Sequence, residues 1–145
     1  MTMNKINDQA SHPLRAMIVE DEILIAEDLK ERLVGFGFCV IANVDTAEEG
    51  IAVAIKEHPD LILMDIRLKG KKDGIQAAEE IRKQIDLPIV YLTAYSDQVT
   101  VERSRQSSHD AYLLKPFQTK ELQSTIDVAM KRHARRVLEK KKIQS

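Results

Sequence analysis

The 145-residue chain has one cysteine, no long apolar run and no apolar block near its start. The lone Cys39 excludes an internal disulfide and agrees with a reducing compartment. Because Cys39 lies in an apolar stretch, we expect a buried, inert thiol. The longest apolar runs span only a few residues, whereas a membrane-crossing helix needs about 20. Residues 1–13 also lack the features of a signal peptide. These absences favour a soluble, cytoplasmic protein without a membrane partner.

Net positive charge is absent from most of the chain and concentrated at its end. The formal net charge is −1, yet residues 131–145 carry seven Lys or Arg against one acid, Glu139. This tail is therefore +6 and leaves the first 130 residues at −7. Such a basic end could contact nucleic acid or an acidic partner. No aromatic or base-reading side chains are interleaved with the charges, so we expect a solvated helix end and no nucleic-acid partner.

The pattern of apolar residues divides the chain into three parts. Residues 1–13 are polar and aperiodic, which indicates a flexible leader. Residues 14–130 alternate between strand-like and helix-like segments, and 43% hydrophobic content is enough for one core. Residues 131–145 continue the last helix as a basic extension. The sequence has no internal repeat and no low-complexity segment.

Periodicity predicts five strands that alternate with five helices. The strands are expected at about 15–19, 38–42, 61–64, 89–92 and 111–114. The helices are expected at about 22–34, 46–58, 74–84, 96–108 and from 119 onward. Thr46 to Glu49 has the pattern of a capping box. The alternation implies an α/β fold with a doubly wound parallel sheet. The segment 96–108 has only two aliphatic residues, so we expect its helix to be weakly held.

Chemically useful residues follow four of the five predicted strands. They are Glu20 and Asp21, Asp65, Thr93, and Lys115. Ligands of an open parallel sheet bind outside the carboxyl ends of the strands, so these side chains should converge. Three carboxylates in a partly desolvated pocket repel one another, and a hard cation resolves that repulsion. Mg²⁺ fits because it takes oxygen ligands and keeps several waters.

The order and spacing of five motifs resemble the receiver domain of a two-component response regulator, over roughly residues 14–130. The motifs are Val19-Glu20-Asp21-Glu22, Asp65, Asp73-Gly74, Leu92-Thr93-Ala94 and Lys115-Pro116-Phe117. The resemblance implies a CheY-like, flavodoxin-like sheet of strand order 2-1-3-4-5. It also implies a phosphorylation-dependent switch, either stand-alone or cut from a longer regulator. Such a protein catalyses only its own phosphorylation and dephosphorylation, so we do not expect an enzyme that turns over an outside metabolite.

The resemblance assigns the phosphorylation chemistry to Asp65. This carboxylate would accept a phosphoryl group from the phosphohistidine of a histidine kinase or phosphotransfer protein. Mg²⁺ would be held by Glu20, Asp21, Asp65 and the backbone carbonyl of Arg67. The ion would bridge Asp65 and the phosphoryl group and neutralise charge as the bond forms.

The remaining site residues bind the phosphoryl group or transmit its arrival. Lys115 would contact the phosphoryl oxygens, and its bond to Pro116 is usually cis in the family. Thr93 would donate a hydrogen bond to the same oxygens, and Tyr112 would turn inward behind it. The output is expected on the face formed by residues 96–108, the strand 111–114 and the last helix. That face could also mediate a homodimer.

The loop after Asp65 departs from the family pattern. It lacks the usual proline, is one residue longer, and contains Gly70 and three lysines, so we expect it to be flexible and basic. The lysines could steer an acidic or phosphorylated partner, or simply be solvated. Arg67 and Tyr95 flank the phosphate site and could govern how fast water attacks the acyl phosphate.

Three other functions stay open. A Mg²⁺-dependent phosphohydrolase of the haloacid-dehalogenase type would place a second aspartate where Arg67 stands. A flavodoxin-like electron carrier would need Ser, Thr or Gly in place of Glu20-Asp21-Glu22 to bind a flavin phosphate. A phosphorylation-independent interaction module is disfavoured by the complete set of pocket residues.

Overall fold

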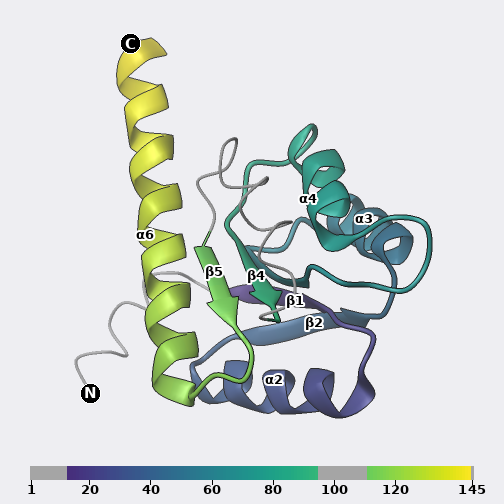
Figure 1. Ribbon diagram of the computed structural model, residues 1–145. Helices are drawn as coiled ribbons and strands as arrows, with labels where there is room; N and C mark the ends of the chain where they lie inside the picture. The colour runs from purple at the N-terminus through teal and green to yellow at the C-terminus, as the bar shows by residue number, and fades with distance from the viewer. Residues whose placement is uncertain (1–12, 95–110, 145) are drawn as a thin grey trace.

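The computed structural model describes residues 13–94 and 111–144, and its elements carry the labels of Figure 1. Five parallel strands form one sheet of order β2-β1-β3-β4-β5. The strands are β1 (Arg15–Val19), β2 (Cys39–Val44), β3 (Leu61–Asp65), β4 (Ile89–Thr93) and β5 (Ala111–Leu114). The predicted fold class and the strand order implied by the resemblance are thus confirmed.

Within the described residues, four helices cover the two faces of the sheet (Figure 1). They are α2 (Ile23–Gly35), α3 (Ala47–Glu57), α4 (Gly74–Arg82) and α6 (Thr119–Gln144). Side chains of α2 and α6 share one buried cluster with the sheet, and those of α3 and α4 share the other. The helix predicted over 96–108 lies outside the described residues.

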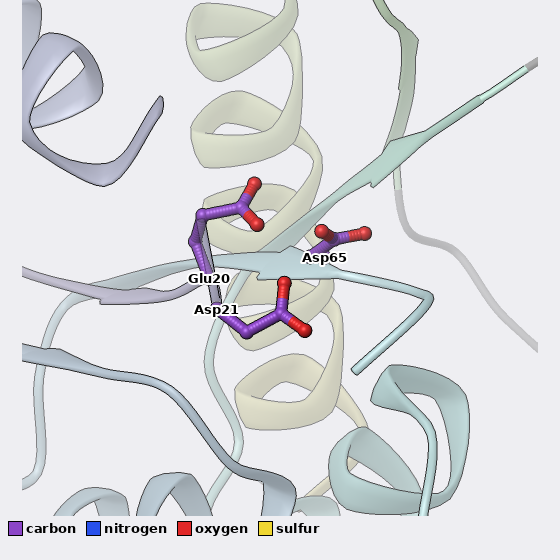
Figure 2. Close-up of side chains that lie close together, drawn as sticks. All are labelled: Glu20, Asp21 and Asp65. Atoms are coloured by element: carbon purple, nitrogen blue, oxygen red, sulfur yellow. The ribbon is translucent and has the colours of Figure 1, made fainter. Parts of the chain in front are cut away.

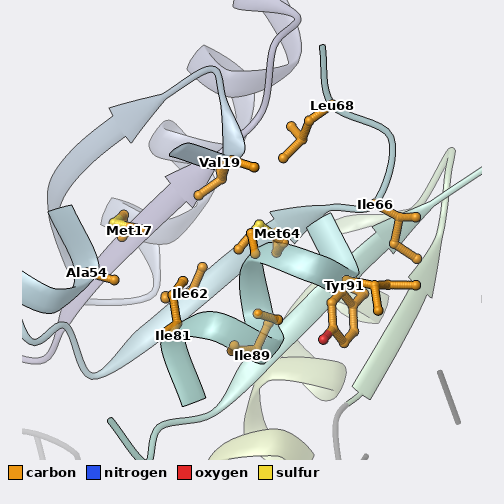
Figure 3. Close-up of a cluster of buried hydrophobic side chains, with 14 of the residues drawn as sticks. Met17, Val19, Ala54, Ile62, Met64, Ile66, Leu68, Ile81, Ile89 and Tyr91 are labelled. Carbon is orange, nitrogen blue, oxygen red and sulfur yellow. The ribbon is translucent and has the colours of Figure 1, made fainter. Parts of the chain in front are cut away.

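The central strand β3 is buried on both faces because helices cover both sides of a parallel sheet. Leu61 and Leu63 pack toward α2 and α6. Ile62 and Met64 pack toward α3 and α4 (Figure 3). All four side chains are fully buried. The alternation explains why this strand reads as a continuous apolar run. It also places Asp65 at the end of a strand that is buried along its whole length.

Polar caps define the starts of α3 and α4. The Thr46 hydroxyl accepts a hydrogen bond from the Glu49 backbone at 3.2 Å, which is one half of the predicted capping box. The complete box occurs at α4, where Gln76 N donates to Asp73 Oδ1 at 2.8 Å and Asp73 N donates to Gln76 Oε1 at 2.9 Å. This box fixes the start of α4 directly after the loop that follows Asp65.

The expectation of a buried thiol is wrong, because Cys39 is exposed. Cys39 is the first residue of β2, which lies at the edge of the sheet and, among the described strands, pairs with β1 alone. The apolar residues that flank Cys39 pack on one side of this edge strand, and the other side is open to solvent.

The final helix extends beyond the part of it that covers the sheet. Leu122, Ile126 and Ala129 are buried against the sheet, and the helix then continues to Gln144. In this extension, His133 Nε2 lies 3.1 Å from the backbone oxygen of Asp86. Most of the basic side chains of the extension are exposed. Among the residues that the structure describes, no helix is both long and apolar enough to cross a bilayer.

Candidate functional site

The parallel register brings the predicted site residues to one edge of the sheet. Glu20 and Asp21 follow β1, Asp65 ends β3, Thr93 ends β4 and Lys115 follows β5. Val19 pairs with Met64, Leu92 with Asp65, and Leu114 with Thr93. The C-terminal ends of the four strands are therefore level, which is the placement that sequence reasoning predicted.

Three carboxylates gather at this edge (Figure 2). Glu20, Asp21 and Asp65 each offer an oxygen, and these oxygens lie within 4.8 Å of one another. Glu20 is 2% exposed and Asp65 is 5% exposed, so two of the three charges are largely removed from water. Oxygen donors at this spacing are the ligands that a hard divalent cation prefers. The donor set therefore fits Mg²⁺.

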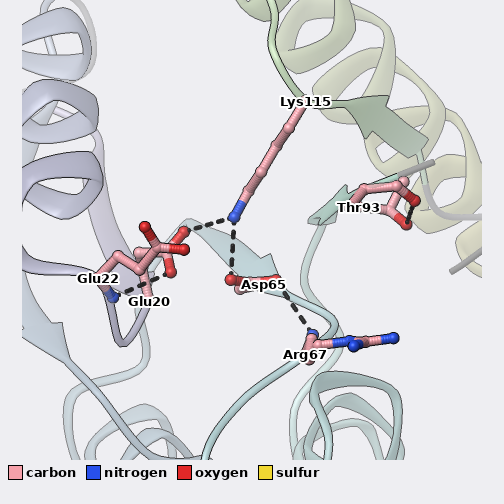
Figure 4. A network of polar contacts seen from close by, with 7 residues as sticks. Glu20, Glu22, Asp65, Arg67, Thr93 and Lys115 are labelled. Atoms are coloured by element: carbon pink, nitrogen blue, oxygen red, sulfur yellow. Dashed lines mark hydrogen bonds and ion pairs between the residues drawn. The ribbon is translucent and has the colours of Figure 1, made fainter. Parts of the chain in front are cut away.

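Lys115 lies between two of these carboxylates (Figure 4). Its Nζ donates to Glu20 Oε1 at 2.9 Å and to Asp65 Oδ2 at 3.0 Å. Its backbone N donates to the Thr93 carbonyl at 2.7 Å, and its bond to Pro116 is cis, as the resemblance implied. Burial lowers the pKa of Lys115, but the contacts with the two carboxylates outweigh it and raise the pKa above the usual value. Lys115 is therefore a fixed positive charge.

Glu20 is the group of the cluster whose ionisation is most perturbed. Burial first, and the neighbouring Asp65 carboxylate second, raise its pKa from 4.5 to about 7. The hydrogen bond from Lys115 acts in the opposite direction without cancelling the effect. The Glu22 backbone N also donates to Glu20 Oε2 at 3.2 Å. Burial beside a second carboxylate therefore disfavours the ionised form of Glu20, although Lys115 is bonded to it.

The backbone after β3 holds Asp65 in place. Arg67 N donates to Asp65 Oδ1 at 3.1 Å, and the Arg67 side chain is exposed (Figure 4). Gly74 N donates to the carbonyl of Ile66 at 2.8 Å. A Cβ on Gly74 would collide with the backbone oxygen of Asp65. The Asp73-Gly74 motif therefore allows α4 to begin against the end of β3.

The two predicted switch residues lie on neighbouring strands, Thr93 at the end of β4 and Tyr112 within β5. The Thr93 hydroxyl donates to the carbonyl of Ala94 at 3.2 Å (Figure 4), and Thr93 is 5% exposed. The half-buried Tyr112 stacks on Tyr91, with ring centroids 5.0 Å apart and planes 22° apart. Sequence reasoning did not find Tyr91, which reads as an ordinary apolar strand residue. Tyr95 lies outside the described residues.

An open cavity of about 370 Å³ lies over Asp65. It is lined by Asp21, Glu22, Asp65, Arg67, Lys69, Ala94 and Lys115. Thr93 is not in this lining. Lys69 does line the cavity, although sequence reasoning singled it out only as one of three lysines in a basic loop.

The chain matches a known family over most of its length. The family model for the response regulator receiver domain matches residues 16–127. The transcriptional regulatory protein PdtaR of Mycobacterium tuberculosis is 39% identical over 132 residues, which cover 91% of this chain and 64% of PdtaR. This chain thus spans less than two thirds of the length of that relative.

Solved structures show the same similarity. The signal receiver domain of a modulated diguanylate cyclase from Desulfovibrio desulfuricans G20 has a TM-score of 0.75 and 32% identity, over 84% of this chain and 96% of that one. The receiver domain of the sensor histidine kinase PA1611 from Pseudomonas aeruginosa PAO1 has a TM-score of 0.71 and 32% identity, over 81% of this chain and 97% of that one. The second structure has a magnesium ion coordinated in its active site cleft.

Proposed function

This chain belongs to the response regulator receiver domain family, and we propose on that premise that it is a phosphorylation-dependent switch of a two-component system. The arrangement of Asp65 carries the proposal. One oxygen of this buried carboxylate accepts from Lys115 and the other from the Arg67 backbone, next to two further carboxylates. Asp65 would accept its phosphoryl group from a histidine kinase or a phosphotransfer protein, and we place this exchange in the cytoplasm.

We assign Mg²⁺ to the carboxylate cluster. Glu20, Asp21 and Asp65 would hold the ion, with the Arg67 backbone carbonyl as the further ligand that the resemblance implies. Once bound, Mg²⁺ offsets negative charge between Asp65 and the incoming phosphoryl group. Two observations support this assignment: the three carboxylate oxygens that lie within 4.8 Å of one another, and the magnesium ion in the active site cleft of the PA1611 receiver domain.

The phosphoryl transfer requires one nucleophile and one fixed cation. A carboxylate oxygen of Asp65 would form a bond to phosphorus as the phosphorus–nitrogen bond of the phosphohistidine breaks, and the imidazole takes the electron pair. Lys115, already 3.0 Å from Asp65 Oδ2, would then contact the new phosphoryl oxygens. The product stays on the protein, so the chain modifies itself and turns over no outside metabolite.

The switch follows from the resting position of Thr93. Its hydroxyl donates to Ala94 O in this structure and would turn to donate to a phosphoryl oxygen. Tyr112 would then move behind it, away from its present stack on Tyr91. The signal would leave through the face formed by residues 96–108, β5 and α6, to a partner or a second copy. The first of these segments lies outside the described residues.

Intact mass after incubation with acetyl phosphate and Mg²⁺ tests the proposal. The wild-type chain should gain one phosphoryl group, and a chelator should prevent the gain. Asp65→Asn should take up none while keeping its thermal unfolding temperature. Asp127→Asn is the matched control, because Asp127 is exposed on α6 and away from the cluster. An adduct that persists in Asp65→Asn would contradict the assignment of the nucleophile.

A further inference from the structure

The loop between β3 and α4 holds the backbone of Lys69 at the edge of the cavity. Leu68, directly before it, is 9% exposed and belongs to the core. Lys69 itself forms a parallel bridge with Thr46, the N-cap residue of α3. Gly70, directly after it, has a φ of +103°, a conformation that favours glycine. These three features hold one residue of the basic loop in a defined place.

The three lysines of this loop have different surroundings. Lys72 Nζ lies 2.7 Å from Glu80 Oε1 and is thus paired. Lys71 is exposed and absent from the cavity lining. Lys69 lines the cavity, and within the described part of the chain it forms no ion pair and no side-chain hydrogen bond. Its ammonium group is available to a ligand in the cavity.

The cavity lining carries a second lysine, Lys115, whose ammonium group is already engaged. Lys115 is bonded to Glu20 and Asp65 before any ligand arrives. Asp21 and Glu22 add two more carboxylates to the surroundings. The lining thus holds three carboxylates, with Asp65, and three cationic side chains, with Arg67, and the carboxylates repel an anionic phosphodonor. The Lys69 ammonium group, which has no carboxylate partner among the described residues, can attract the donor against that repulsion.

We propose that Lys69 is a donor-binding residue of this pocket: its ammonium group contacts the phosphoryl oxygens of an incoming acyl phosphate and raises the efficiency of transfer to Asp65. The inference rests on the proposed function and adds a residue to it. With acetyl phosphate, a carboxylate oxygen of Asp65 bonds to phosphorus, the bond from phosphorus to the acetyl oxygen breaks, and acetate leaves with the electron pair. Lys69 takes part in no bond change. Its ammonium group helps to bind the phosphodonor before the phosphoryl group is transferred.

Phosphorylation rates at saturating Mg²⁺ and a series of acetyl phosphate concentrations test the inference, with intact mass as the readout. Lys69→Ala should lower the second-order rate constant about three- to tenfold, the range expected for one partly solvated ionic contact. Lys69→Glu should lower it further, and Lys69→Arg should restore it because the charge returns. Lys71→Ala is the matched control and should stay within about twofold of wild type, because that lysine does not line the cavity.

Added salt gives a second readout that a merely structural role would not move. The wild-type rate constant should fall as salt screens the attraction, and Lys69→Ala should show a weaker dependence. Equal rate constants for Lys69→Ala and Lys71→Ala, in a chain that is phosphorylated normally, would overturn the role of Lys69 alone. A wild-type chain that takes up no phosphoryl group would overturn the proposed function, and this inference with it.

Discussion

Lowering the pH from 8 to 6 should weaken Mg²⁺ binding through Glu20. The pKa of this carboxyl is about 7 in the metal-free protein, because it is buried beside Asp65. A carboxylate must lose its proton to serve a metal site, so protons and Mg²⁺ compete for Glu20. The competition is strongest below pH 7, where the protonated form dominates.

The size of the effect follows from that pKa. The ionised fraction of Glu20 is about one tenth at pH 6 and about nine tenths at pH 8. The Mg²⁺ affinity should therefore rise about tenfold between these two values. Near pH 6, each bound ion should displace about one proton.

Isothermal titration calorimetry at pH 6 and pH 8 measures both quantities. Two buffers of different ionisation enthalpy at pH 6 reveal the proton released on binding. Glu20→Gln should bind Mg²⁺ weakly at both pH values, without the tenfold change. Glu139→Gln, a change of an exposed residue on α6, should behave as wild type. Equal wild-type affinity at pH 6 and 8, with no proton release, would refute the reasoning.

The same pKa predicts the stability of the metal-free protein. A carboxyl whose folded pKa is raised contributes stability that is present below its ordinary pKa of 4.5 and is lost as the pH rises through about 7. The unfolding temperature of the wild type, measured relative to Glu20→Gln, should therefore fall between pH 6 and 8. Saturating Mg²⁺ should reverse the fall, because the ion binds the folded state.

Three further changes test how the site is held. Gly74→Ala should destabilise the fold by about 3 kcal/mol in chemical denaturation, since the added methyl group collides with the end of β3, whereas Gly35→Ala meets open space and should be nearly neutral. Asp73→Ala should lose about 1 kcal/mol with the capping box of α4, and an unchanged denaturation midpoint would contradict that role. Lys115→Met should lose about 2 kcal/mol at pH 8 and less at pH 6, where Glu20 takes up a proton; an equal loss at both pH values would count against the pairing.

The sequence was sufficient for the strands and for their convergence at one edge. The run Leu61–Met64 is apolar without interruption because β3 is covered on both faces, and Asp65 interrupts the apolar pattern where the strand reaches the site. The strand order came from the family resemblance, because periodicity does not say which strands are neighbours. The edge position of β2 then decides the exposure of Cys39, which local hydrophobicity alone could not show.

The directions in which the side chains of the site point could not be predicted from the sequence. The Thr93 hydroxyl has a backbone acceptor next to it, Ala94 O, and this local bond determines where it points when no phosphoryl group is bound. The place of Lys69 depends on a bridge to Thr46, a contact between two loops that are distant in sequence. The complete capping box at Asp73 likewise requires the geometry of the preceding loop.

The contacts around Asp65 favour a response on the side of β5 and α6. Lys115 joins Asp65 Oδ2 through its side chain and the Thr93 carbonyl through its backbone, so one residue links the ends of three strands. A phosphoryl group on Asp65 would give the Lys115 ammonium new oxygen partners, and any shift of Lys115 would act on Thr93 and on the end of β5. On the other side, Lys115 Nζ is also bonded to Glu20, whose backbone N donates to the Val44 carbonyl of β2 at 2.9 Å. Because Lys115 itself follows β5, we expect its response to act on that edge strand more directly than on β2, which it reaches through Glu20.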